Sequence, residues 1–356
     1  MRAKLLLSFG VGLAALVSGA PGRAQDQAQV CVSASGGTFQ DALRESIFRP
    51  FEKATGIKVI ETVEQPLAKL RAMVNTGNPG CDVVMLTSNN YFVLSREGVL
   101  EKIDYDSVDK KTFTDFPKDK VTPYGVGTFV YAKVISFNTK HYSRENGPKS
   151  WADVWDVKKF PGPRILDAGE GRVLATIEAA LLAQGVSSDK LYPIDLKRAY
   201  DSLAQLKPNV VKWTTTGAMG PEALISGEAF IGAAPMGRIQ QAKEQGAPVD
   251  YVWNQALLLN DYWTILKGTT NYKNAITFIE FASRPESQAG MAKLQAVGPL
   301  NKRAFDLTER AKLAPTYAEN LAHAIYLAPG WWAQTDGSGK SNVEKNNAMW
   351  NAWILQ

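Results

Sequence analysis

The stretch that decides the fold is residues 33–60, SASGGTFQDALRESIFRPFEKATGIKVI. An extended segment, QVCVSAS, leads into the pair Gly36-Gly37, and an amphipathic helical segment follows it. The next segment, GIKV, has the composition of a second strand. Because glycine lets another group come close to the backbone, the pair indicates that a bound molecule lies at this turn. The alternative is an ordinary capping turn in which Thr38 is the N-cap.

The chemistry of this turn favours an anionic or polar oxygen over an ammonium group. Ligands of open α/β sheets lie beyond the carboxyl ends of the strands, and a helix N-terminus carries partial positive charge. Ser35 and Thr38 add hydroxyl groups, and Phe39 follows directly. We therefore expect a carboxylate, a phosphonate or a similar group to bind at the turn, in contact with Ser35, Gly36, Gly37, Thr38 and Phe39.

Strands and helices alternate from the start of this region. Apolar strand-like segments and helical segments follow one another as VCVSAS (30–35), TFQDALRESIFRPFEKAT (38–55), IKVIETV (57–63), PLAKLRAMVNTG (66–77), DVVMLTS (82–88) and NYFVLSREG (90–98). Gly56 and Gly98 are placed to end their helices. Apolar strands alternating with helices are typical of a parallel sheet covered on both faces. The sequence therefore predicts an α/β fold, in which PYGVGTFVYAKVISFNT (123–139) is the best candidate for a strand joining two domains.

The N-terminus has the pattern of a signal peptide. Arg2 and Lys4 precede an apolar run of about 13 residues, which is short of the ~20 that span a bilayer. We expect cleavage after Ala24, with Ala20 as the alternative site, so that 1–24 is removed and the protein is exported. The other interpretation is a membrane anchor. No later stretch is apolar enough to cross a membrane.

Length and charge limit the function. About 330 mature residues exceed what one core usually supports, so we expect two domains. Removing Arg2, Lys4 and Arg23 from the 40 basic residues leaves 37 against 35 acidic ones. This small excess gives no support to nucleic-acid binding.

Cys31 and Cys81 are the two cysteines, and each lies at the start of a predicted strand. If those strands are parallel neighbours, both thiols lie near the same edge and can form a disulfide in an oxidising compartment. Closing a loop of this length is worth about 4 kcal/mol in the chain-entropy model. The alternative is two buried thiols.

The chemistry of an enzyme is missing from the sequence. Histidine occurs only as His141 and His323, and neither lies near another group of metal-ligand type. Nucleophile-elbow, zinc-protease, phosphate-loop and dinucleotide-binding motifs are absent. We therefore expect no catalytic activity, no cofactor and no metal site.

The chain resembles the periplasmic solute-binding proteins of ABC importers, and most closely their spermidine/putrescine-binding branch. The segments that carry this resemblance, in the expected order, are FEKATGIKV, CDVVMLTSNNYFVLSREGVLEKID, PKSWADVWDVKKFPG, LKPNV and NDYWTILKGTTNYKNAITFIEFASRPE. The resemblance implies a two-lobed α/β protein of the type II periplasmic binding class, with two strand-like hinge crossings and a ligand cleft between the lobes. It would close over a small ligand in the periplasm and present it to a membrane permease, and we assume a monomer. The implied lobes are 25–130 with 258–306, and 131–257 with 307–356.

The residues implied for the ligand match a polyamine only in part. Asp261 matches the family acid that pairs an amine, whereas the positions expected to be aromatic hold Asn89, Pro235, Leu259 and Val297. The acidic pair expected after PRIL is blurred, because Asp167 and Glu170 are differently spaced and Arg172 intrudes. Separately, Arg238 lies near a position where a small residue is usual. Losing aromatic rings, each worth roughly 0.5–2 kcal/mol to a cation, argues against a linear polyamine.

An acid for an amine, together with arginine and a glycine turn for an anion, favours a zwitterion such as an amino acid, an opine-like conjugate, an amino-carboxylate or an aminophosphonate. A true polyamine remains the alternative, as do a sensor for a membrane receptor and a periplasmic enzyme. Trp253 and Trp263 can instead be core residues, and Arg172 can be a surface charge on a helix. Arg238 can instead cap a helix or pair with a neighbouring carboxylate, and Trp331-Trp332 can be either packing or a lid. The full predicted ligand set is Ser35, Gly36, Gly37, Thr38, Phe39, Asn89, Thr128, Glu170, Arg172, Trp213, Thr216, Arg238, Trp253, Asn254, Asp261 and Tyr262.

Overall fold

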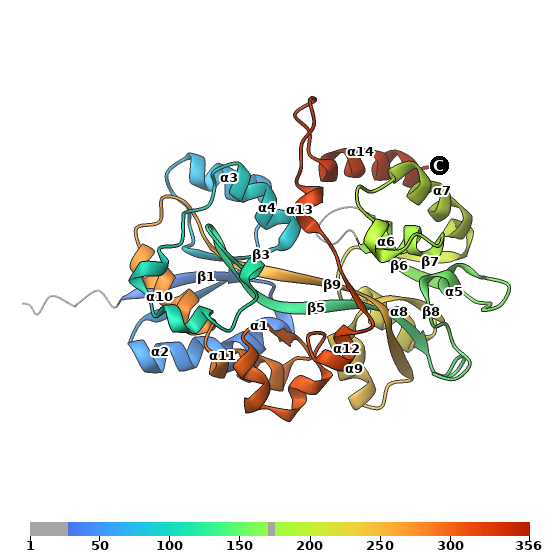
Figure 1. The fold of residues 1–356 in the computed structure, drawn as a ribbon, viewed down its shortest axis with the longest axis horizontal. Coiled ribbons are helices and arrows are strands. Elements are labelled where there is room, and N and C mark those ends of the chain that lie inside the picture. The colour runs from blue at the N-terminus through green and yellow to red at the C-terminus, as the bar shows by residue number, and fades with distance from the viewer. Residues whose placement is uncertain (1–27, 170–174) are drawn as a thin grey trace, which may run out of the picture.

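The computed structural model describes residues 28–169 and 175–356 (Figure 1). The predicted signal peptide 1–24 and the predicted ligand residues Glu170 and Arg172 lie outside the described residues. Within the described part of the chain, no helix is long and apolar enough to cross a membrane.

The described strands form one mixed sheet in the order β2-β1-β3-β9-β5-β8-β6-β7, with β4 and β10 on β5 and β11 on β9. At one end β1 pairs in parallel with β2 and β3, and at the other β6 pairs in parallel with β7 and β8. The long strands β5 and β9 pair antiparallel and run through both halves. The strands are β1 Gln29–Ala34, β2 Lys58–Val63, β3 Val83–Thr87, β4 Val121–Thr122, β5 Gly125–Asn138, β6 Arg164–Asp167, β7 Val210–Thr214, β8 Ile231–Pro235, β9 Val249–Ile265, β10 Gly298–Pro299 and β11 Ala324–Tyr326.

Helices cover both faces of each half (Figure 1). We call the half that contains β1, β2 and β3 the first lobe and the half that contains β6, β7 and β8 the second lobe. The described helices are α1 Gly37–Leu43, α2 Arg49–Thr55, α3 Leu67–Asn75, α4 Ser88–Arg96, α5 Trp151–Trp155, α6 Ala175–Ala183, α7 Leu196–Leu206, α8 Met219–Ser226, α9 Met236–Glu244, α10 Tyr272–Ala282, α11 Pro285–Leu294, α12 Ala318–Leu321, α13 Pro329–Trp332 and α14 Asn342–Ile354. The predicted α/β fold is confirmed, and β5 lies in the segment predicted to cross between domains.

The glycine pair has a conformational role of its own. Gly36 (φ 72°) and Gly37 (φ 58°) both adopt the left-handed region, which other residues occupy at a cost. Gly36, and not Thr38, is the N-cap of α1. A π-helical turn, Arg44–Phe48, joins α1 to α2 without a break, so the chain reverses sharply after β1 and then continues as one helix.

The first lobe packs around an aromatic core. The rings of Phe51 and Phe278 meet edge to face with 5.3 Å between their centroids. Trp263 is fully buried and packs at 5.4 Å against Phe278. Trp263 is therefore a core residue, as the alternative interpretation held. The second lobe has a separate core that includes Trp151, Leu203 and Trp332.

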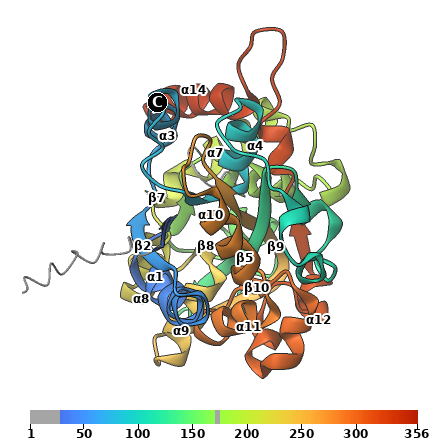
Figure 2. The ribbon, with the colours of Figure 1, turned by 90° about the vertical axis from the view of Figure 1, so that its left-hand side faces the viewer.

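The C-terminal segment contacts both lobes. After α11 it packs on the first lobe, pairs β11 with β9 and enters α13. There Arg96 of α4 donates a hydrogen bond to the carbonyl of Ala333, while Trp332 Nε1 donates to Glu178 Oε1 of α6 at 2.8 Å. The last helix, α14, lies at the same end of the molecule as α3 and α4 (Figure 2). The segment therefore links α4 in the first lobe to α6 in the second.

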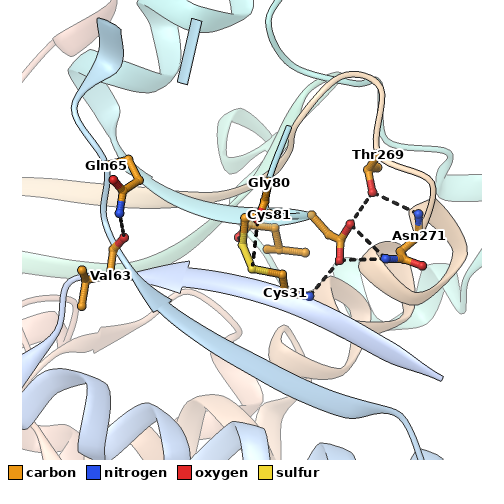
Figure 3. Close-up of a disulfide and its surroundings, with 9 residues drawn as sticks. Cys31, Val63, Gln65, Gly80, Cys81, Thr269 and Asn271 are labelled. Carbon is orange, nitrogen blue, oxygen red and sulfur yellow. Dashed lines mark hydrogen bonds between the residues drawn. A yellow bond between two sulfur atoms is a disulfide. The ribbon is translucent and has the colours of Figure 1, made fainter. Parts of the chain in front are cut away.

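Cys31 and Cys81 form a disulfide (Figure 3), as predicted. It joins β1 to the segment that enters β3. The backbone N–H of Cys31 also donates to Asp82 Oδ2 at 2.8 Å, and Thr269 and Asn271 donate to the same carboxylate. The disulfide and this carboxylate thus join β1, the segment that enters β3 and the segment from Thr269 to Asn271.

We expect the double variant Cys31→Ser/Cys81→Ser to fold but to lose about 4 kcal/mol of unfolding free energy, because the unfolded chain is no longer constrained by the loop. Urea titration of the oxidised protein and the variant measures the difference. Wild type in excess reductant is the control and should match the variant. A loss below about 1 kcal/mol would contradict the expectation.

Glu178 is a fully buried carboxyl group under the C-terminal segment. Tyr192 Oη donates to its Oε1 at 2.7 Å and Trp332 Nε1 donates to the same atom at 2.8 Å. Burial raises the pKa of Glu178 to about 7. Between the unfolded pKa of 4.5 and the folded one, the native state therefore binds more protons than the unfolded state, and stability falls as the pH rises through that window.

Glu178→Gln should remove this pH dependence, because the amide keeps an acceptor oxygen for Tyr192 and Trp332 and does not titrate. Urea unfolding at pH 5 and pH 8 measures it. We expect the stability of wild type relative to the variant to fall by about 2–3 kcal/mol between these values. Parallel pH profiles of the two proteins would instead mean that the carboxyl group does not stay protonated in the fold.

Candidate functional site

A cavity of about 680 Å³ lies between the lobes, a size typical of small-molecule sites. We call it the cleft. The residues that line it are Ser35, Gly36, Thr38, Phe39, Thr87, Thr128, Phe129, Tyr131, Ala132, Lys133, Asp167, Ala168, Thr214, Thr215, Thr216, Gly217, Ala218, Pro235, Met236, Gly237, Arg238, Asp261, Gln295, Ala296, Val297 and Asn347. Eight residues of the predicted ligand set belong to this lining: Ser35, Gly36, Thr38, Phe39, Thr128, Thr216, Arg238 and Asp261.

The glycine turn supplies one wall of the cleft. Ser35 and Thr38 are exposed at its surface, and Phe39 is half-buried against the first-lobe core. Gly36 lines the cavity, whereas Gly37 is not part of the lining. The turn therefore presents hydroxyl groups, the start of a helix and one aromatic ring to whatever occupies the cleft.

Two threonine hydroxyls in the wall have no hydrogen-bond partner among the described residues. Thr87 (3% exposed) ends β3, and Thr128 (1% exposed) lies in β5. A buried hydroxyl without a partner costs free energy, so these two are suited to bind a polar ligand or water. Thr87 was not predicted. It ends a parallel strand, and the argument applied to Ser35 at the end of β1 could have identified it.

Asp261 comes to the cleft from β9. It is paired in register with Thr87 on β3 and is 9% exposed. The structure thus brings Asp261 and the glycine turn to one cavity, although they are far apart in sequence. One solute in this cavity could therefore contact Asp261 with its positive end and the glycine turn with its negative end, as the sequence predicts.

The second lobe contributes a buried ion pair that sequence reasoning missed. Lys133 Nζ of β5 lies 2.6 Å from Asp167 Oδ2, at the end of β6. Thr214 Oγ1, at the end of β7, donates to Asp167 Oδ1 at 2.8 Å. The available signal was a single lysine in the apolar run FVYAKVISF, since a buried charge requires a partner. Arg238, in α9, is exposed at the surface of the cleft.

Other predicted ligand residues lie outside the cleft lining. Tyr262 is buried and stacks on Tyr91 at 4.1 Å, and Trp213 packs against Trp350 at 5.1 Å. Side chains alternate across a strand, so Asp261 and Thr214 reach the cleft while their neighbours Tyr262 and Trp213 turn to the other face.

Trp253 and Asn254 also have partners elsewhere. Trp253 packs against Tyr251 with 5.6 Å between ring centroids, and the exposed Asn254 donates to the carbonyl of Lys149 at 2.9 Å. Both lie near the far end of β9, eight and seven residues before Asp261 along an extended strand. Length alone therefore carries them away from the cleft.

A second cavity of about 600 Å³ adjoins the cleft, and Ser35 and Asn347 line both. Asn89, another predicted ligand residue, lines this second cavity with Arg71 of α3 and Glu344 of α14. Neither Trp331 nor Trp332 lines either cavity. Their contacts with Tyr192 and Glu178 are those of packing.

No metal-binding group is found among the described residues: they contain no cluster of three or more His, Cys, Asp and Glu side chains suited to a metal ion. The charged side chains of the cleft, Lys133, Asp167, Arg238 and Asp261, are suited instead to ion pairing with a solute.

Known proteins share both sequence and fold with this chain. The γ-aminobutyric acid-binding protein of Pseudomonas aeruginosa is 32% identical, covering 98% of this chain and 95% of that protein. Periplasmic proteins that bind spermidine and putrescine also match, at 26% identity for that of Escherichia coli. The predicted resemblance to that branch is confirmed, although the identity to the γ-aminobutyric acid-binding protein is higher.

Two solved structures match over nearly their whole length. An ABC transporter substrate-binding protein from Bradyrhizobium japonicum USDA 110 has a TM-score of 0.84 and 32% identity, covering 92% of this chain and 99% of that one. A periplasmic binding protein of A. tumefaciens R10 in complex with agropinic acid has a TM-score of 0.80 and 32% identity, with the same two coverages. These matches confirm the two-lobed fold and the expected role in an ABC importer.

The family model for bacterial extracellular solute-binding proteins matches residues 46–322, most of the chain. This span contains both crossing strands, β5 and β9, and β9 carries Asp261. The proteins that match are solute-binding proteins, not enzymes. The chain belongs to the bacterial extracellular solute-binding protein family and serves as the periplasmic solute-binding component of an ABC importer.

Proposed function

We propose that the captured solute is a small zwitterion that carries one amine and one carboxylate. The observation that carries this proposal is the presence of opposite charges in one cavity: the Asp261 carboxylate from the first-lobe side of β9 and the Arg238 guanidinium from α9 both line the cleft. A cavity built for polycations would favour carboxylates alone.

The amine end of the solute would bind Asp261. Tyr131 and Phe39 line the same cavity, and aromatic faces attract ammonium groups in addition to the carboxylate. The aliphatic Pro235 and Val297 complete this part of the lining. They can contact a short methylene chain but cannot stack against a row of ammonium groups.

The carboxylate end would bind the glycine turn and Arg238. Thr38 lies in the first turn of a helical run, where the partial positive charge favours an anion. Thr87 and Thr128 have hydroxyl groups without partners in the described chain and lie on the two strands beside Asp261, so their oxygens can accept hydrogen bonds from the amine end of the solute. Arginine is also the side chain best suited to pair a planar carboxylate.

The relatives support the same class of solute. A γ-aminobutyric acid-binding protein and a structure in complex with agropinic acid each share 32% identity with this chain, whereas the polyamine-binding protein of E. coli shares 26%. The solute of this chain would accordingly be an amino-carboxylate or an opine-like conjugate.

Capture would proceed by closure of the lobes about β5 and β9, a hinge motion about two crossing strands. The closed monomer would then engage the permease, after export directed by the signal peptide 1–24. The lobe boundaries 130/131 and 257/258 proposed from the sequence both fall inside these strands. Closure would remove water from the solute, so a solute whose charged groups find no partner in the cleft would bind weakly.

A thermal-shift screen tests the solute class. A ligand at 100 times its Kd adds about 2.7 kcal/mol to the stability of the folded state, which raises Tm by several degrees. We expect 4-aminobutyrate, amino acids or opines to raise Tm and putrescine and spermidine to leave it unchanged. Stabilisation by the polyamines alone would refute the zwitterion proposal while leaving the transport role intact.

Asp261→Asn should weaken binding of the identified solute about 10–100-fold, because it removes a charged hydrogen bond worth roughly 1.5–3 kcal/mol. Isothermal titration calorimetry measures the change in Kd. The matched control is Asn254→Ala, a polar residue of the same strand outside the cleft, which should keep the wild-type Kd. Equal affinities for wild type and Asp261→Asn would exclude Asp261 from the site.

A further inference from the structure

In the cleft wall, the ammonium group of Lys133 compensates the negative charge of Asp167. The Lys133 ammonium contacts both carboxylate oxygens of Asp167, at 2.6 and 2.8 Å. Both residues are buried and both line the cleft. A buried charge is stable only when a partner compensates it. Here the protein itself provides the cation that the Asp167 carboxylate requires.

The neighbours of Asp167 hold its carboxylate in this orientation. Thr214 Oγ1 donates to Oδ1 at 2.8 Å, and Thr176 Oγ1 donates to the backbone carbonyl of Asp167 at 2.8 Å. Lys133 is fixed in turn by β5, where it pairs in register with Leu257 of β9 and Pro235 of β8. Hydrogen bonds and strand pairing therefore hold the ion pair in the wall of the cleft.

The charges of the described residues that line the cleft balance. Among the described residues that line it, Lys133 and Arg238 are positive and Asp167 and Asp261 are negative, so the net charge is zero. One of the two carboxylates is already paired with Lys133. Without the Lys133 ammonium the same lining would carry two carboxylates and one cation, a charge balance that attracts an additional ammonium group.

Building on the proposed function, we propose that Lys133 determines the specificity of the site. Its ammonium occupies the position beside Asp167 that a second ammonium group of a linear diamine or polyamine would take. The cleft therefore accepts a solute with one amine and rejects a solute with two.

The physical reason is repulsion at low dielectric. A ligand ammonium placed at Asp167 lies next to the Lys133 ammonium, and like charges interact strongly where water is excluded. The other possibility is that the ligand displaces Lys133 from Asp167, which leaves a buried ammonium without its carboxylate. Both arrangements cost free energy that a singly charged amine bound elsewhere does not incur.

The test uses Lys133→Gln and three probes with the same four-carbon length. Putrescine carries two ammonium groups, 4-aminobutyrate one ammonium and one carboxylate, and succinate two carboxylates. Glutamine can still donate a hydrogen bond to Asp167 but leaves its negative charge uncompensated. We expect calorimetry to report at least tenfold tighter binding of putrescine than in wild type, with the detection limit used where wild-type binding is too weak to measure. A smaller change overturns the proposal.

The double variant Lys133→Gln/Asp167→Asn is the matched control, since it restores the neutral balance while keeping the shorter side chain. The gain in putrescine binding should disappear in it. A gain that persists would come from the lost bulk of lysine and would overturn the proposal.

If circular dichroism finds Lys133→Gln unfolded, Asp167→Asn decides the question. This variant leaves the Lys133 ammonium without its counter-charge, and succinate should bind at least tenfold more tightly than to wild type. A smaller increase overturns the proposal. The proposed function fails separately, when wild type binds no solute that carries both an amine and a carboxylate.

Discussion

The antiparallel pairing of β5 with β9 is the constraint on which the rest of the structure depends. These strands pair from Gly125↔Thr264 to Asn138↔Val249 and carry the chain through both lobes. The register shifts twice, between Gly127 and Val130 and between Lys133 and Ile135. Such irregularities bend a strand and re-aim its side chains. Thr128 and Lys133 lie at these two shifts, so the features that let β5 cross between lobes also direct its polar groups toward the cleft.

The parallel strands of the two lobes place their carboxyl ends toward each other. Ser35 follows β1 and Thr87 ends β3 on one side, while Asp167 ends β6 and Thr214 ends β7 on the other. Each lobe alone would present an ordinary switch-point site at its sheet edge. Facing one another across the crossing strands, the two edges enclose a cavity whose lining includes the Lys133–Asp167 ion pair, Arg238 and Asp261. This arrangement supports the proposal that the solute carries both signs of charge.

Much of the architecture could be predicted from local sequence. The strand–glycine–helix unit after β1, the helix ends at Gly56 and Gly98 and the β5 crossing follow from short patterns. The Cys31–Cys81 disulfide was predicted from two cysteines that each begin a predicted strand, and it depends on the pairing of those strands. The likeness to solute-binding proteins extended that prediction to two lobes. Gly36 proved to be the N-cap where Thr38 had been considered, because only glycine readily adopts the left-handed turn that the reversal requires.

By itself, the sequence determined the α/β alternation and the identity of the polar residues at strand ends, because each depends on neighbours along the chain. Only the tertiary structure decided which of those residues face one another. The sequence predicted Trp213 and Tyr262 as ligand residues, but their neighbours Thr214 and Asp261 line the cleft instead. Sheet pairing decides which face of a strand points into the cleft. Lys133 gave no local sign of Asp167, its partner in a different strand. Contacts between distant segments are set by packing and strand order, and no short stretch of sequence records them.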